Sequence, residues 1–97
     1  MTDIDSQGNE TRAIHALVDF RGANALEIGC GDGRLTWRYA ESAATVLGLD
    51  SFETDIQRAQ ASTPEHLRAK VQFRREDAVA AEFETASFDI VMFSRSI

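Results

Sequence analysis

Ala25-Leu26-Glu27-Ile28-Gly29-Cys30-Gly31-Asp32-Gly33 is the stretch that decides the fold of this chain. An apolar run over residues 23–28 leads into a turn with glycine at alternate positions, and a helical pattern follows over residues 34–43. Glycine permits positive φ, and its missing Cβ lets a ligand approach the backbone closely. The helix after the turn would direct its unpaired N–H groups at that ligand. The stretch therefore predicts the ligand cradle of a nucleotide-binding α/β fold.

The spacing and the charge of this turn disfavour a dinucleotide. The dinucleotide fingerprint is G-x-G-x-x-G, whereas here the third glycine, Gly33, comes one position early and Arg34 follows it. Glu27 and Asp32 bring two carboxylates to the turn, which would repel a pyrophosphate and attract a positive charge. The pattern thus indicates a cationic adenosine compound rather than NAD, with a tight turn that binds no ligand as the alternative.

Composition limits the other possibilities. The chain has 97 residues, enough for one domain, with 43% hydrophobic and 27% charged residues. Its net charge of −6 is opposite to that expected for a nucleic-acid binder. A single cysteine, Cys30, cannot form an internal disulfide and suits a reducing cytoplasm. The acidic residues 1–5 are unlike a signal peptide, and no apolar run is long enough to span a membrane. We therefore expect a cytoplasmic protein with no membrane, nucleic-acid or metal partner.

The remaining patterns alternate between strand and helix. Short apolar runs predict strands over residues 45–49, 71–74 and 88–93. Helical patterns cover residues 9 or 11 to 20, then 51–62 with Ser51 as cap, and residues 79–83, while Pro64 begins a short turn that buries Leu67. Residues 1–10 are expected to be flexible. This alternation predicts right-handed crossovers and an α/β, Rossmann-like three-layer sandwich, with a parallel sheet covered on both faces.

Polar residues stand where the predicted strands end. In a parallel sheet, ligands bind beyond the carboxyl ends of the strands, and these ends carry the glycine turn, Asp50, Asp77 and Ser94. Asp50 lies 21 residues after Gly29, close to the offset of a ribose-binding acid. A carboxylate there can accept hydrogen bonds from two ribose hydroxyls, although a helix cap or a solvated strand end is the alternative reading.

Four segments, in order, resemble motifs of the class I S-adenosylmethionine-dependent methyltransferases. Residues 26–33 resemble motif I, residues 46–50 motif II, Asp77-Ala78 the motif that follows, and residues 88–91 motif IV. The resemblance implies a methyl transfer from S-adenosyl-L-methionine to an oxygen, nitrogen or carbon acceptor. It names no catalytic base. The chain lacks the Asn/Asp-Pro-Pro-aromatic motif of the nucleic-acid amino methyltransferases, carrying Ser94-Arg95-Ser96 there, which favours a small-molecule acceptor.

The resemblance also assigns the cofactor's contacts. Glu27 and the backbone of the glycine turn would hold its amino acid end, with Ser94 near the methionine part. Asp50 would hold the ribose, Ser51 and Phe52 would line the adenine pocket, and Asp77 with the amide of Ala78 would bind the adenine edge. The full predicted cofactor-binding set is Glu27, Gly29, Cys30, Gly31, Gly33, Asp50, Ser51, Phe52, Asp77, Ala78 and Ser94. We expect Glu27, Asp50 and Asp77 to face one hollow.

The family's domain has a seven-stranded sheet of order 3-2-1-4-5-7-6 and is about twice as long as this chain. Residues 1–97 are therefore expected to be a single, partial cofactor-binding domain of about four strands in order 3-2-1-4. The fourth strand would then be an exposed edge, which favours self-association or pairing with a missing C-terminal half. Two hypotheses follow: the cofactor-binding half of a small-molecule methyltransferase, or a non-catalytic module that binds S-adenosylmethionine or another protein.

Overall fold

The computed structural model describes residues 18–77 and 87–94. Several predicted features lie wholly or largely outside these residues: the helices over residues 9–20 and 79–83, the flexible segment 1–10, and Ala78. The elements in chain order, with η denoting a 3₁₀-helix, are β1 (Asn24–Ile28), η1 (Thr36–Arg38), β2 (Thr45–Asp50), α2 (Glu53–Ser62), η2 (Glu65–Leu67), β3 (Val71–Arg75) and β4 (Ile90–Phe93).

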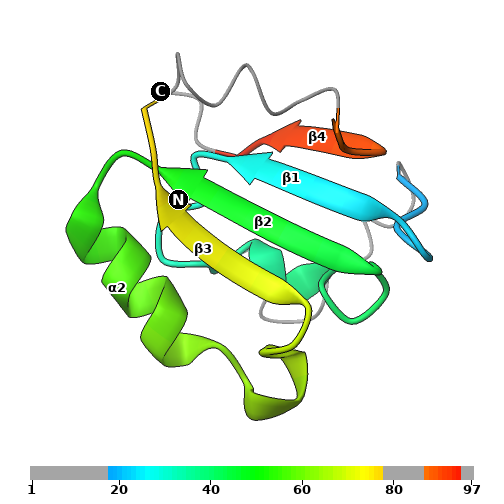
Figure 1. The fold of residues 1–97 in the computed structure, drawn as a ribbon, viewed down its shortest axis with the longest axis horizontal. Helices are drawn as coiled ribbons and strands as arrows, with labels where there is room; N and C mark the ends of the chain where they lie inside the picture. The colour runs from blue at the N-terminus through cyan, green and yellow to red at the C-terminus, as the bar shows by residue number, and fades with distance from the viewer. Residues whose placement is uncertain (1–17, 78–86, 95–97) are drawn as a thin grey trace, which may run out of the picture.

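The four strands form one parallel sheet in the order β3-β2-β1-β4 (Figure 1). All carboxyl ends therefore lie along one edge, and the glycine turn after β1 is central in it. The register places Glu27 of β1 between Gly48 of β2 and Met92 of β4. The predicted Rossmann-like α/β fold and its strand order are confirmed.

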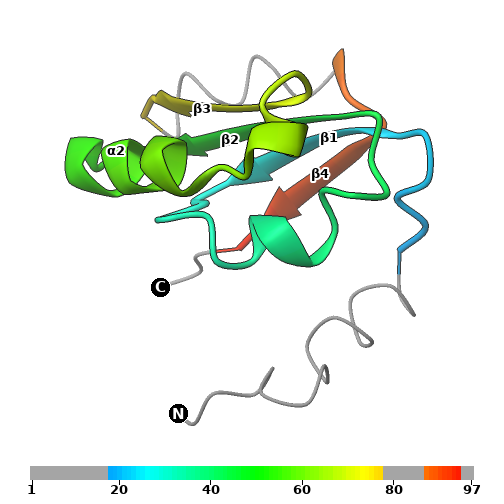
Figure 2. The same ribbon diagram turned by 90° about the horizontal axis from the view of Figure 1, so that it is seen from below.

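The described helical segments pack on one face of this sheet (Figure 2). Side chains of that face, such as Ala25, Val46 and Val71, form a buried cluster with Ile56 of α2 and Leu67 of η2. Leu67 is the buried residue predicted for the turn that Pro64 begins. A second, smaller cluster on the opposite face contains Leu26, Ile28 and Leu49, with Leu47, Phe88 and Val91 packed against it.

The helix predicted over residues 34–43 is wrong as an α-helix. Only the short η1 forms there, and the hydrogen bonds around it mix spans of three and four residues, as in Tyr39 N to Thr36 O and Ala40 N to Thr36 O. Side chains three residues apart eclipse in a 3₁₀ turn, and this lets both Thr36 and Tyr39 reach Glu27. A tertiary contact thus overrides the helical pattern.

The cap of α2 also differs from the prediction. Its N-cap is Phe52 rather than Ser51, and the N-cap side chain makes no capping hydrogen bond. Asp50 instead accepts the Phe52 amide with Oδ1 at 2.9 Å. Within the described residues, no helix is long and apolar enough to cross a membrane.

Candidate functional site at the carboxyl edge of the sheet

The glycine turn has the predicted backbone conformation. Gly29, Gly31 and Gly33 have φ angles of 81°, 58° and 92°, a region that other residues rarely adopt. The turn's amides, however, are used within the chain. Gly29 N and Cys30 N donate to Leu49 O at 2.7 and 3.0 Å, and Gly31 N donates to Asp50 Oδ2 at 2.9 Å. These three amides are therefore not available to form an anion-binding nest for a phosphate. The N–H groups of an α-helix after the turn, which were expected to point at a ligand, are not formed as predicted, because only the short η1 follows.

Glu27 is the buried acid of the site, with none of its surface exposed. Its Oε1 accepts hydrogen bonds from Thr36 Oγ1 at 2.7 Å and from the Tyr39 hydroxyl at 2.6 Å. Its Oε2 is also buried, yet makes no hydrogen bond with any described residue. An unpaired buried carboxylate oxygen is costly, and this atom can accept a hydrogen bond from a donor that enters the neighbouring hollow.

Burial sets the protonation of this cluster. It raises the pKa of Glu27 above its ordinary value. This rise is opposed by the nearby hydroxyl of Ser94, which in the structure donates to Gly29 O, by the hydroxyls of Tyr39 and Thr36, and by the charge of Arg34. Burial, and after it the negative charge of Glu27, raises the pKa of Tyr39. Tyr39 therefore remains protonated and donates to Glu27, while a cation at Oε2 would favour the charged carboxylate.

Asp50 joins the end of β2 to the glycine turn. It is 5% exposed and accepts the amides of Gly31 and Phe52, one on each oxygen. A carboxylate has about four lone-pair positions, so both oxygens can accept a further hydroxyl. The helix-cap alternative weighed for Asp50 is realised in part, because its Oδ1 binds the N-cap amide of α2.

Two adjoining hollows lie along this edge, and Gly29 lines both. The first, about 150 Å³, is lined by Glu27, Gly29, Cys30, Gly31, Asp32, Arg34, Leu35 and Ser94. The second, about 250 Å³, is lined by Ile28, Gly29, Leu49, Asp50, Ser51, Phe52, Glu76 and Phe93. The first is rich in carboxylates, and the second combines one buried acid with apolar walls. Besides Gly29, seven of the other ten predicted site residues line one hollow or the other: Glu27, Cys30, Gly31, Asp50, Ser51, Phe52 and Ser94.

Two predicted residues do not line these hollows. Asp77 is exposed, and Glu76 lines the second hollow instead. Gly33 is needed for packing, since a Cβ there would lie 3.1 Å from Trp37 and 3.3 Å from Phe73. The rings of Trp37 and Phe73 meet edge to face with centroids 5.6 Å apart, so this tryptophan has a packing role.

Sequence reasoning missed Glu76 and Phe93. Glu76 N donates to Asp50 O at 2.9 Å, which brings the residue after β3 beside the end of β2. Phe93 pairs with Ile28 in the register and is 68% exposed. The available signal for Phe93 was its place at the carboxyl end of a predicted strand, where ligands of parallel sheets bind.

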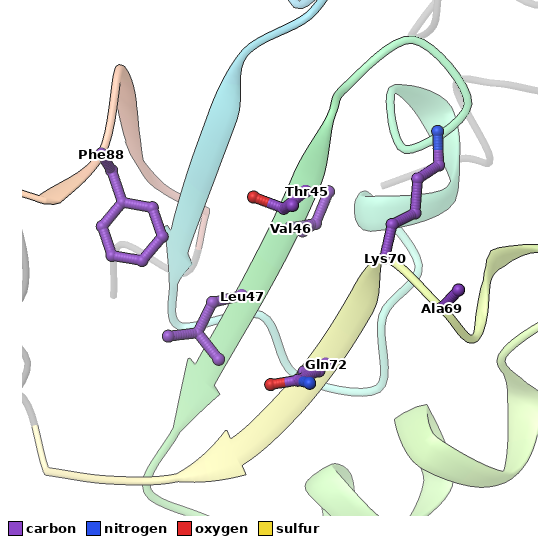
Figure 3. Close-up of a pocket in the computed structure, with 7 residues that line it drawn as sticks. All are labelled: Thr45, Val46, Leu47, Ala69, Lys70, Gln72 and Phe88. Atoms are coloured by element: carbon purple, nitrogen blue, oxygen red, sulfur yellow. The ribbon is translucent and has the colours of Figure 1, made fainter.

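Another hollow of about 250 Å³ lies at the opposite, amino end of the strands (Figure 3). Its lining includes Thr45, Leu47, Gln72 and Phe88. The Lys70 side chain runs away from it, and its Nζ donates to the carbonyls of Glu41 and Ala43 at 2.9 and 2.8 Å. Since it is remote from the glycine turn, this hollow belongs to neither half of the candidate site.

The fold and the site define a Rossmann-like domain with carboxylates at successive strand ends, beside two adjoining hollows. Comparison with known proteins makes the class specific: residues 25–97 match the sequence model of the methyltransferase domain family. The chain is 34% identical over 83 residues to the demethylmenaquinone methyltransferase of Lactococcus lactis subsp. lactis, covering 82% of this chain and 33% of that protein. It is 36% identical over 72 residues to the ubiquinone biosynthesis O-methyltransferase of Leptothrix cholodnii, covering 72% of this chain and 30% of that protein.

Solved structures agree. The S-adenosylmethionine-dependent methyltransferase of Mesorhizobium loti is 30% identical with a TM-score of 0.60, over 77% of this chain and 34% of that one. The chain belongs to the class I S-adenosylmethionine-dependent methyltransferases. S-adenosyl-L-methionine, predicted from the sequence, is the cofactor of that family. The chain spans about a third of the length of the curated relatives it matches.

Proposed function

We propose that this chain binds S-adenosyl-L-methionine across the two adjoining hollows, as the cofactor-binding half of a methyltransferase that acts on a small molecule. The observation that carries the proposal is the unpartnered, fully buried Glu27 Oε2 beside a hollow that continues past Gly29 to Asp50. A ligand that has an ammonium group at one end and a ribose and an adenine at the other suits this order of groups.

Each part of the site has a role in this proposal. Glu27 Oε2 accepts from the ammonium group, near Ser94, whose hydroxyl donates to Gly29 O at 2.9 Å. Asp50 accepts from the ribose hydroxyls while it keeps its two amides. Phe52 and Phe93 flank the adenine, and Asp77 and Ala78 remain predicted contacts to its edge. Cys30 and Gly31 line the first hollow, and Gly33 lets the turn pack closely against Trp37 and Phe73.

When bound, the cofactor supplies an electrophilic methyl group on a positively charged sulfur. Methyl transfer depends mainly on alignment of the acceptor with that methyl group, so the described residues would contribute by fixing the cofactor. A small aromatic or quinol-like acceptor is proposed by analogy with the named quinone-pathway relatives. The alternative is a module that binds the cofactor without catalysis, and a methyl-transfer assay on such acceptors separates the two.

Titration calorimetry with S-adenosylmethionine, S-adenosylhomocysteine and NAD tests the binding proposal. We expect the two sulfur compounds to bind and NAD not to bind, because the turn carries carboxylates and its amides are occupied. Binding of NAD alone, or of none of the three, would contradict the proposal.

We also propose that β4 pairs with a further strand, from a second copy or from a C-terminal half. In the described sheet β4 pairs with β1 alone, so its outer backbone groups are open to pairing. Size-exclusion chromatography with light scattering is the test, and a stable dilute monomer with a cooperative melt would count against it.

A further inference from the structure

The two oxygens of the Glu27 carboxylate have unequal surroundings. Oε1 accepts two short hydrogen bonds, from Thr36 and Tyr39, at 2.7 and 2.6 Å. Oε2 accepts none from the described residues, although it is equally buried. Neither Thr36 nor Tyr39 lines the hollow that Glu27 lines. Any effect that these two hydroxyls have on a ligand must therefore pass through Glu27.

Both donors are held rigidly. The Tyr39 ring stacks on Phe20 with centroids 4.4 Å apart and an interplanar angle of 17°, and 1% of Tyr39 is exposed. Thr36 is fully buried. Two fixed donors on one oxygen restrict rotation of the carboxylate, and hydrogen bonds to a charged acceptor are about twice as strong as neutral ones.

We propose that Tyr39 and Thr36 are positioning residues that occupy Oε1 of Glu27 and thereby hold Oε2 in place for the ammonium group of the cofactor. This inference rests on the proposed function and deepens it. The pair makes the site selective for adenosine compounds that carry the amino acid end over compounds that lack it. An ammonium group has three donors, and one of them satisfies the single unmet acceptor in the cluster.

The arrangement also predicts a pH dependence of binding. Glu27 faces the hydroxyls of Thr36 and Tyr39 from the η1 turn and Ser94 after β4. Arg34, Asp32 and the Cys30 thiol share its hollow from the glycine turn. Removing the Tyr39 hydroxyl withdraws a donor that favours the charged carboxylate. The pH below which an ammonium ligand is lost should therefore move upward.

The experiment measures, by calorimetry, the affinity of the 97-residue chain for S-adenosylhomocysteine and for 5′-methylthioadenosine, which lacks the amino acid end. Tyr39→Phe keeps the ring stacked on Phe20, and Thr36→Val keeps the volume of the side chain. Thr63→Val is the matched control, because Thr63 is also buried and its hydroxyl donates to Ala59 O at 2.9 Å, away from both hollows.

We expect Tyr39→Phe and Thr36→Val each to weaken the binding of S-adenosylhomocysteine about tenfold and to raise the pH midpoint of that binding. Methylthioadenosine should bind to all variants with equal affinity, and Thr63→Val should change the affinity for neither ligand. Equal losses for both ligands, or no loss for either, would overturn the positioning role while leaving the proposed function intact. If the unmodified chain bound neither ligand, both proposals would fail. Should one variant not fold, the other decides.

Discussion

The Asp50 carboxylate accepts the amide of Gly31 at 2.9 Å, so the acid at the end of β2 holds the turn that follows β1. Together with the bond from Gly29 N to Leu49 O, this contact fixes the glycine turn against the neighbouring strand. The residue expected to bind the ribose is thus also a structural part of the turn, and loss of its side chain should affect both folding and binding.

Asp50→Ala should lower the free energy of unfolding by about 1–3 kcal/mol, because it leaves buried amide donors without an acceptor. It should also abolish binding of S-adenosylhomocysteine. Urea denaturation and calorimetry measure the two effects. Asp89→Ala is the matched control, since Asp89 also accepts a backbone amide, from Asn24 at 2.9 Å, but is exposed and lies at the other end of the sheet. Equal stability losses for both variants would contradict this account.

The stability of the ligand-free chain should fall as the pH rises above the ordinary range of a glutamate. Burial raises the pKa of Glu27, so the folded state binds more protons than the unfolded state between the two pKa values. The free energy of unfolding decreases through that window. Asp19, whose pKa is lowered to about 2, acts in the opposite sense, with stability lost as the pH falls below its ordinary range. Denaturation from pH 4 to 8 should show the decrease in the unmodified chain and a flatter profile in Glu27→Gln.

Gly48→Ala should destabilise the sheet through overpacking. A Cβ there would lie 2.6 and 2.8 Å from atoms of the Phe73 ring and 3.1 Å from Cys30 Sγ. We expect a loss of about 1–3 kcal/mol, and the additional change Phe73→Leu should recover part of it. The comparison is Gly22→Ala, where no atom lies within 4 Å of the new Cβ and only its φ of 69° opposes the substitution. A double variant no more stable than the single one would argue against steric overlap.

Phe52→Ala and Phe93→Ala should each weaken the binding of 5′-methylthioadenosine about five- to tenfold, with little change in the free energy of unfolding. These rings are 60% and 68% exposed and line the same hollow, so their removal costs the fold little buried surface. Calorimetry with methylthioadenosine measures the effect. Unchanged affinity in both variants would show that the adenine lies elsewhere.

Sequence reasoning succeeded where a residue's role is set by its neighbours in the chain. The run before Gly29 and the apolar stretches at residues 45–49, 71–74 and 88–93 gave the strands, and their order followed from the family resemblance. It placed Glu27, Asp50 and Ser94 at one edge because parallel strands end together.

Prediction from the sequence failed where contacts between residues far apart in the chain decide the local structure. The pattern over residues 34–43 is compatible with an α-helix, but the hydroxyls of Thr36 and Tyr39 both bind Glu27 and hold a 3₁₀ turn there. Nothing in the local sequence shows that Asp50 would accept the Phe52 amide in place of a Ser51 cap, since the outcome depends on the path of the chain between β2 and α2. That Glu76 lines the second hollow and Asp77 does not likewise depends on the contact between the ends of β2 and β3.

If Glu27 binds the cofactor as proposed, its unsatisfied oxygen couples the folding of this chain to the supply of that ligand. A compound that provides the missing donor binds the native state alone, so each increase in its free concentration shifts the unfolding equilibrium toward the native state. At a free ligand concentration one hundred times the dissociation constant, binding adds about 2.7 kcal/mol to the free energy of unfolding. This is a large share of the total free energy of unfolding of a small domain. The chain should therefore unfold at a lower temperature, and be cleaved faster by proteases, when S-adenosylmethionine is scarce.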